Sequence, residues 1–349
     1  MTVAGKFLKK MAPGLYAPLV GGIGWLRRLF QSRAPYITDD LGGSFKEYVK
    51  THDKDVLLGR LLTGLDPQSQ TVVRCITNRV LLFDDAAQRW SAARKNKTVH
   101  ELLPVELPPQ KREIQAVLRQ CARQFDLLGA RPEASVFYFF HGLVLLPPPV
   151  VTKLRNTHCM DVGAYVGDSA IALSRYGFTK IFSFEMSVLS AERYLKNMDR
   201  HGIDQKQFVL IREGVARDDE VGRVVIHDAG SAGTSLFRNG NVRQALEVPT
   251  RSTDTMVEAY GIEPRFIKVD IEGAAKEFVL GATRTLTRYR PVLSIAIYHN
   301  PTEYFEVKPL LEEVLPNYTF MIRKLDPGVT QNLIHSEVVL LAWPNEMNN

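Results

Sequence analysis

Residues 159–173 read CMDVGAYVGDSAIAL, and the fold of the chain is decided in this stretch. An apolar run ends at an aspartate, two glycines follow four residues apart, and a helical pattern of apolar residues begins after them. Gly163 permits a sharp turn at the end of a strand, and Gly167 lets the next helix approach closely. The stretch therefore predicts a strand, a turn and a helix that bring backbone N–H groups up to a ligand. A tight turn with a packing glycine and no ligand is the alternative.

A second acid downstream points to the kind of ligand. Glu185 in FSFEMS follows Gly167 by 18 residues (185 − 167 = 18), where an acid ending the next strand would accept hydrogen bonds from ribose hydroxyls. NAD requires a GxGxxG turn for its diphosphate, whereas here Asp161 precedes the first glycine and Tyr165 stands between the two. A carboxylate repels a diphosphate and suits an ammonium group. The pattern therefore favours S-adenosylmethionine, which has an ammonium, a sulfonium and no phosphate, over NAD.

The rest of the chain from about residue 150 alternates between strand-like and helix-like segments. Apolar segments such as KIFSF, RFIKV and VLSIA are separated by amphipathic segments of helical period. This alternation is typical of an α/β protein whose mainly parallel sheet is covered by helices on both faces. YTFMIRKL and HSEVVLLAW follow each other at the end and predict a C-terminal antiparallel hairpin. Between residues 221 and 252, VGRVVIHD and EVPTRS predict a small antiparallel excursion.

Four motifs along this part, DVGAYVGDS, FSFEMS, STDTMVEAYGIEPRFIKVDIEGA and SIAIYHNP, resemble those of the FkbM family of methyltransferases, in the same order. The resemblance extends from about residue 136 to residue 343. It implies a class I, Rossmann-like methyltransferase fold with a seven-stranded sheet. It also implies methylation of a hydroxyl group on a glycan, a glycolipid or a secondary metabolite. The chain departs from the family at Ala275, where an acid is usual, and Glu277 is the acid close by.

Three parts of the chain are predicted. Residues 1–38 are a basic N-terminal extension, residues 39–135 are mostly helical, and residues 136–349 are the methyltransferase domain. The segment ASVFYFFHGLVLL, which begins at residue 134, is aromatic and β-branched and predicts a hairpin or a bent strand. The aromatic side chains around His141 are expected to pack in the core.

The cofactor is expected to lie beyond the carboxyl ends of the strands, where such sheets bind ligands. Asp168 or Ser169 should also cap the helix that begins there, and Met186 should form an apolar wall for adenine. The full set of predicted cofactor residues is Asp161, Gly163, Ala164, Tyr165, Gly167, Asp168, Ser169, Glu185, Met186, Gly214, Val215 and Asp270.

Three residues are candidates for catalysis: His299, Asp270 and Glu272. His299 ends the strand PVLSIAIYH and would remove the proton of the acceptor hydroxyl, since histidine is the commonest general base. A histidine that only orients the loop at Asn300 is the alternative. Glu272 is either a contact of the cofactor or acceptor, or a helix cap. Residues 229–240 would either cover the acceptor or form a surface loop. No carboxylate cluster indicates a metal.

Composition and charge argue against disulfide-rich, zinc-binding and nucleic-acid-binding proteins. The 349 residues are 45% hydrophobic, and the three cysteines show no spacing for a disulfide framework or a zinc site. The net charge of +6 comes from six basic residues and no acids in residues 1–38, which leaves 38 bases against 38 acids elsewhere. The body therefore has no basic excess for nucleic acid. We expect a cytoplasmic protein whose residues 1–33 either contact anionic lipid or pack on the body. The alternative functions are a non-catalytic binding protein with the cofactor fold at the membrane surface and, less favoured, an NAD-dependent oxidoreductase.

Overall fold

The computed structural model describes residues 42–82, 103–204, 206–219, 223–228, 244–327 and 336–349. The predicted basic extension and the predicted cover loop at 229–240 lie outside these residues. Within the described parts of the chain, no helix has the length and apolar character needed to cross a membrane.

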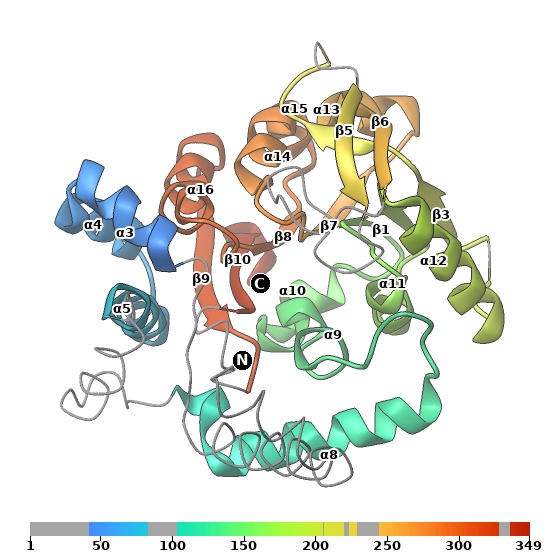
Figure 1. The fold of residues 1–349 in the computed structure, drawn as a ribbon, viewed down its shortest axis with the longest axis horizontal. Helices are drawn as coiled ribbons and strands as arrows, with labels where there is room; N and C mark the ends of the chain where they lie inside the picture. Colours follow the sequence, from blue (N-terminus) through green and yellow to red (C-terminus); the bar gives the residue numbers. More distant parts are fainter. Residues whose placement is uncertain (1–41, 83–102, 205, 220–222, 229–243, 328–335) are drawn as a thin grey trace, which may run out of the picture.

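A seven-stranded sheet with the order β3-β2-β1-β7-β8-β10-β9 forms the centre of the molecule (Figure 1). Neighbouring strands from β3 to β8 are parallel, and only β10 runs antiparallel to its two neighbours. The predicted α/β class, with a seven-stranded, mainly parallel sheet and a C-terminal antiparallel hairpin, is confirmed. The strands are β1 (His158–Val162), β2 (Lys180–Phe184), β3 (Phe208–Ile211), β7 (Pro264–Val269), β8 (Val292–Ala296), β9 (Tyr318–Lys324) and β10 (Val338–Pro344).

A separate three-stranded sheet, with the order β4-β6-β5, lies at the edge next to β3 (Figure 1). Strands β5 and β6 pair antiparallel, as the excursion predicted. The segment FVLIREGVA does not form one strand, because β4 leaves the main sheet and pairs parallel with β6. The bounds are β4 (Gly214–Ala216), β5 (Arg223–Asp228) and β6 (Gln244–Ser252).

Two groups of helices cover the sheet, one on each face (Figure 1). The first group is α9 (Ala134–Phe137), η2 (Phe140–Leu145), α10 (Pro148–Thr152), α11 (Asp168–Leu173), η3 (Ser174–Tyr176) and α12 (Val188–Arg200). The second is α13 (Thr253–Ala259), α14 (Ala275–Gly281), α15 (Thr283–Tyr289) and α16 (Pro301–Val314). Helices α14 and α15 are separated at Ala282.

The N-terminal helices lie outside this arrangement. Helix α5 packs on the edge strand β9, and α4 packs on α16, while α8 runs past α9 at the other side of the molecule (Figure 1). The bounds are α3 (Gly42–Thr51), α4 (Lys54–Leu62), α5 (Pro67–Leu82), η1 (Pro104–Glu106) and α8 (Pro108–Gln124); η4 (Asn345–Met347) ends the chain. A buried bidentate pair, Arg79 with Glu106 at 2.9 Å, joins α5 to η1.

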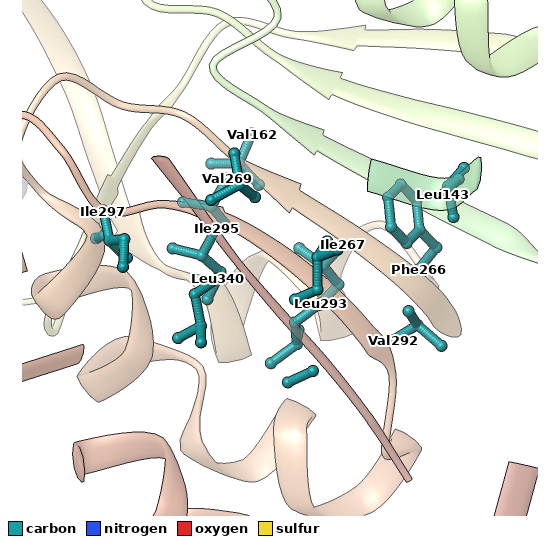
Figure 2. Close-up of a cluster of buried hydrophobic side chains, with 14 of the residues drawn as sticks. Leu143, Val162, Phe266, Ile267, Val269, Val292, Leu293, Ile295, Ile297 and Leu340 are labelled. Carbon is teal, nitrogen blue, oxygen red and sulfur yellow. The ribbon is translucent and has the colours of Figure 1, made fainter. Parts of the chain in front are cut away.

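The core consists of aliphatic side chains from the middle strands, and η2 adds Leu143 to it (Figure 2). Ile267, Leu293 and Leu340 have no exposed surface. Burial of each such side chain contributes about 1.5–3 kcal/mol to stability. Strands β8 and β10 are buried along their whole length, as expected when helices cover both faces.

The prediction of a hairpin or bent strand in residues 134–146 is wrong. Phe140, His141 and Gly142 have φ of 48°, 53° and 87°, and three successive left-handed residues cannot continue a strand. The backbone instead bonds locally, for example from Gly142 N–H to Phe139 C=O at 2.9 Å. The aromatic side chains do pack in the core, with Phe137 and Phe139 buried. Core packing against the sheet therefore outweighed the strand propensity of these residues.

Candidate active site

The turn after β1 is shaped by two glycines, in the way the sequence predicts. Gly163 has φ of 84°, and a Cβ there would lie 1.8 Å from the carbonyl oxygen of Asp270, at the end of the neighbouring strand. Gly167 has φ of 87°, and its Cβ would meet Tyr194 and Met198 of α12 within 2.8 Å. Only glycine fits either position. The turn therefore presses the backbone of residues 163–167 against β7 on one side and α12 on the other.

Glu185 lies directly after β2, where its carboxylate supports this turn. One carboxylate oxygen accepts the Tyr165 backbone N–H and the other accepts the Ser187 N–H, both at 2.7 Å. Burial raises the pKa of Glu185 to about 7, although these two hydrogen bonds favour the ionised form. The carboxylate is partly buried. It has further lone pairs that could accept hydrogen bonds from a ligand hydroxyl.

Met186, the residue after Glu185, packs on Gly214. A Cβ on Gly214 would lie 2.6 Å from the Met186 sulfur, so the thioether packs directly on the glycine backbone. Val215 beside it is buried. The structure thus brings the residues predicted to border adenine into one apolar surface, and Gly214 belongs to the small sheet instead of ending β3.

Asp161 has a partner that the sequence analysis did not identify. Its carboxylate is fully buried and lies 3.1 Å from the Lys268 ammonium group, which comes from the register-opposed position on β7. Lys268 also donates a hydrogen bond to the Gly163 carbonyl at 2.5 Å. Burial raises the pKa of Asp161, and Lys268 opposes that rise. Asp161 therefore forms an ion pair with Lys268 beneath the turn. A direct contact between Asp161 and an ammonium group of the cofactor stays a prediction.

The start of α11 differs from the prediction. Gly167 is the N-cap, and neither Asp168 nor Ser169 makes a side-chain cap bond. Both are buried in the first turn of the helix, where the Asp168 carboxylate accepts its neighbour's N–H at 2.9 Å. Burial raises the pKa of Asp168 to about 6. Capping by these side chains is wrong because the left-handed Gly167 already takes that position. Ala164, in the same turn, is also buried.

The ends of β7 and β8 bring Asp270 and His299 together. His299 Nε2 lies 3.2 Å from Asp270 Oδ1, and its Nδ1 lies 3.0 Å from Glu303 Oε2 in α16. The His299 side chain is 8% exposed and that of Glu303 is 1% exposed. Although burial lowers the pKa of His299, the two carboxylates outweigh it and hold that pKa well above the ordinary value. Burial raises the pKa of Asp270, but His299 and Lys268 reverse this and lower it to about 2.

Glu272 lies in the turn between β7 and α14, with φ of 53°. It does not cap α14, because the N-cap is Ala274. Burial, and then the charges of nearby acids that include Glu272, raise the pKa of Tyr298, the neighbour of His299, so Glu272 lies near it. At the family's acidic position, Ala275 is buried and its backbone N–H donates to Glu303 Oε1 at 2.9 Å. Glu303, and not Glu277, thus places a carboxylate against position 275.

A cavity of about 340 Å³ is linked to this region through Tyr298, and none of Asp270, His299 and Glu303 lines it. Its lining comes from α8, from the segment around α9, and from the ends of β9 and β10: Leu118, Pro132, Glu133, Ala134, Ser135, Asp326, Pro327, Ser336 and Glu337. Glu337 accepts a hydrogen bond from the Tyr298 hydroxyl at 3.0 Å, which connects the cavity to the strand end that carries His299. Partial desolvation and the neighbouring acids Glu337 and Asp168 raise the pKa of Glu133, although its side chain is exposed. Among the described residues that line the cavity, three carry carboxyl groups and none is basic.

Sequence reasoning missed Lys268 and Glu303. Lysine within the apolar segment RFIKVD was a signal, since a buried lysine needs a carboxylate partner. Asn300-Pro301-Thr302-Glu303 is a capping pattern, in which Asn300 accepts the Glu303 N–H at 2.8 Å. The Glu303 carboxylate reaches back to the His299 N–H at 3.3 Å. Among the described residues, no group of three or more histidines, cysteines or carboxylates could hold a metal ion.

Comparison with known proteins gives a family for the central part of the chain. The family model described as "Methyltransferase FkbM domain" matches residues 161–326. The match agrees with the resemblance to the FkbM methyltransferases that the motifs carry. No curated protein matches the chain.

One solved structure with a TM-score above 0.5 has the same fold. A methyltransferase FkbM from Methylobacillus flagellatus is 15% identical, with a TM-score of 0.54 over 86% of this chain, and the match covers 61% of that protein. A putative O-methyltransferase from Klebsiella pneumoniae is 15% identical, covers 73% of this chain and 96% of that chain, and has a TM-score of 0.38. An O-methyltransferase from Bacillus cereus in complex with SAH is 14% identical, covers 68% and 93%, and has a TM-score of 0.40.

Proposed function

We propose, from the premise that residues 161–326 match the methyltransferase FkbM domain, that the chain is an S-adenosylmethionine-dependent O-methyltransferase. Its acceptor is a hydroxyl group of a glycan, a glycolipid or a secondary metabolite. The observation that carries the proposal is the group of Asp270, His299 and Glu303 beyond the ends of β7 and β8. A buried, carboxylate-oriented histidine at this edge suits the removal of a hydroxyl proton.

The residues of the turn fit the cofactor. The Glu185 carboxylate, held by two backbone amides, would accept hydrogen bonds from ribose hydroxyls. Met186, packed on Gly214, would cover one face of adenine. The backbone of the turn packs at Gly163 on the Asp270 carbonyl, which places the turn beside Asp270. When bound, S-adenosylmethionine supplies an electrophilic methyl carbon on a sulfonium.

The protein then has two tasks, to position the acceptor oxygen and to receive its proton. We assign the second task to His299 through Nε2, the nitrogen that faces Asp270. The hydroxyl proton passes to Nε2 while the acceptor oxygen forms a bond to the methyl carbon. The electron pair of the broken S–C bond returns to sulfur. Asp270 keeps the imidazole at the strand end and stabilises the positive charge that it gains.

We place the acceptor in the cavity lined by Glu133 and Glu337. Its volume of about 340 Å³ lies within the usual range for small-ligand sites. Three carboxyl groups without a basic side chain disfavour a phosphate-rich acceptor such as nucleic acid and suit hydroxyl groups. The carboxyl groups of Glu133, Asp326 and Glu337 can accept hydrogen bonds from the hydroxyl groups of such an acceptor.

The proposal is tested by methyl transfer from S-adenosylmethionine labelled in its methyl group. The purified chain is incubated with panels of neutral sugars, glycolipids and hydroxylated metabolites, and a nucleic-acid panel serves as comparison. We expect label in an ether linkage, identified by mass spectrometry, on a hydroxylated acceptor. Label on a nitrogen atom or on nucleic acid contradicts the proposal.

Replacing Glu185 with glutamine is expected to weaken the binding of S-adenosylhomocysteine by about 10- to 100-fold. A hydrogen bond to a charged group is worth about 1.5–3 kcal/mol, and the amide would present an N–H group to either the ribose or the turn. In the unsubstituted protein, affinity should rise as the pH increases through about 7, because Glu185 becomes ionised there. Isothermal titration calorimetry measures both effects. Glu192→Gln, on the exposed side of α12, is the matched control, and equal affinity of the two variants removes Glu185 from the site.

A further inference from the structure

The segment that follows α8, residues 126–130, is bonded to one face of α12. The Asn197 side chain is fully buried there and bonds both backbone groups of Leu128. Its Oδ1 accepts the Leu128 N–H at 2.8 Å, and its Nδ2 donates to the Leu128 carbonyl at 3.3 Å. One turn earlier on the helix, Arg193 packs against Gly129, where a Cβ would lie 2.8 Å from the Arg193 Cδ.

The same segment is also bonded to the turn after β1. Asn197 Nδ2 donates a second hydrogen bond, to the Val166 carbonyl at 2.9 Å, and the Tyr165 hydroxyl donates to the Gly129 carbonyl at 2.6 Å. Both N–H groups of the Asn197 amide are thus used, and its oxygen accepts a third bond. We call the Asn197 and Tyr165 side chains, together with the backbone groups that they bond, the latch.

Tyr165 connects the latch to the predicted cofactor site. Its φ of 47° is left-handed, and a residue other than glycine keeps such a conformation only where its surroundings hold it. The Tyr165 N–H donates to Glu185 Oε2 at 2.7 Å, so Glu185 holds the backbone of this residue while Gly129 holds its hydroxyl. In the other direction along the chain, Pro132 and Glu133 follow Gly129 closely and line the cavity.

We propose that Asn197 and Tyr165 are positioning residues that couple the cofactor site to the wall of the acceptor cavity. A ligand that bonds to Glu185 and lies on the turn fits the conformation that the closed latch imposes on Tyr165, and it loses contacts when the latch opens. Binding of the cofactor therefore strengthens the latch, and a closed latch raises the affinity for the cofactor by the same factor. The inference rests on the proposed function for the identity of the ligand and of the cavity.

Hydrogen exchange at the Leu128 amide measures the latch, because this N–H is bonded to Asn197 and is released when the latch opens. In the free full-length protein, Tyr165→Phe should speed this exchange by about 2- to 10-fold, the effect of losing one neutral hydrogen bond. Tyr138→Phe is the matched control. The Tyr138 hydroxyl also bonds to α8, through Glu113 at 2.8 Å, but it does not belong to the latch. This variant should leave the exchange at Leu128 unchanged.

Saturating S-adenosylhomocysteine tests the coupling in the unsubstituted protein. It should slow exchange at Leu128 by at least about 5-fold, and at Lys111 by less than about 2-fold. The Lys111 N–H bonds to the Leu107 carbonyl at the start of α8 and so reports any general stabilisation of the fold. Asn197→Ala removes three bonds of the latch at once and should lower the affinity for S-adenosylhomocysteine by at least about 3-fold in calorimetry.

The outcomes separate this inference from the proposed function. If S-adenosylhomocysteine binds but does not slow exchange at Leu128, or slows Leu128 and Lys111 equally, the inference is wrong. An exchange rate in Tyr165→Phe equal to that of the unsubstituted protein also overturns it, and this variant loses only one hydroxyl at a half-buried position, so the test does not depend on the folding of Asn197→Ala. Absence of S-adenosylhomocysteine binding contradicts the proposed function, and the coupling fails with it.

Discussion

Replacing His299 with glutamine should reduce the rate constant of methyl transfer by about 10²- to 10⁴-fold, the usual contribution of a positioned general base. Glutamine is close to histidine in size and can still donate to Glu303 or Asp270, so the loops after β7 and β8 keep their bonds. It has no nitrogen that can take up a proton. The loss should therefore fall on kcat, and S-adenosylhomocysteine should bind with nearly unchanged affinity because Glu185 and the turn at Gly163 are intact.

The rate of methyl transfer should also change with pH in a defined direction. Two carboxylates hold the pKa of His299 well above the ordinary value, so the imidazole carries a proton at neutral pH in the free protein. Only the neutral form accepts the hydroxyl proton. The rate of the unsubstituted protein should therefore increase with pH as His299 loses its proton, above the range where an ordinary histidine titrates. The residual rate of His299→Gln should lack this rise.

His158→Gln is the matched control for the rate measurement. His158 begins β1 and thus lies at the opposite end of the sheet, where its Nδ1 accepts the Glu263 N–H at 3.1 Å. This variant should retain the rate and the pH profile. If His299→Gln keeps more than a tenth of the activity, His299 only orients the loop at Asn300, and the proton leaves by another route.

The fold was largely predictable because local pattern and tertiary structure agree along the second half of the chain. A wholly apolar strand has no polar side that could face solvent, so both of its faces must be covered. The turn after β1 admits only glycine at positions 163 and 167. The sequence-based predictions were wrong where tertiary packing determines the backbone conformation. The aromatic segment 134–146 has high strand propensity, yet the three left-handed residues around His141 turn it into two short helical pieces.

The positions of the candidate residues were predictable, but their pairings were not. Asp161, Glu185, Asp270 and His299 all lie at the predicted ends of strands. The partner of Asp161 depends on the register between β1 and β7, which the sequence does not specify. The partner of His299 depends on a carboxylate in the following helix that folds back over the strand end. Both partners change what the predicted residues can do, because the sequence analysis gave neither residue a partner within the protein. Lys268 pairs with Asp161, and Glu303 pairs with His299.

Replacing Lys268 with methionine should destabilise the protein by about 3–5 kcal/mol, the usual cost of leaving one partner of a buried ion pair alone. Asp161 has no exposed surface and would retain no cation against its carboxylate, and the Gly163 carbonyl would lose the donor at 2.5 Å. The double variant Asp161→Asn, Lys268→Met should recover part of the loss, since no charge is then buried.

Denaturant unfolding and amide hydrogen exchange along β1 and β7 measure the Lys268→Met effect, and the pH dependence identifies its cause. Without Lys268, the pKa of Asp161 in the folded state should rise further above its value in the unfolded chain, so protonation favours the folded state. The deficit relative to the unsubstituted protein should therefore shrink as the pH falls and grow as it rises above the ordinary range of an aspartate. Lys276→Met removes a lysine whose pair with Glu306 is about one-third exposed and should cost at most about 1 kcal/mol. Equal losses for the two lysines, or a Lys268→Met deficit independent of pH, would show that Lys268 contributes by packing and that its charge does not hold Asp161 beneath the turn.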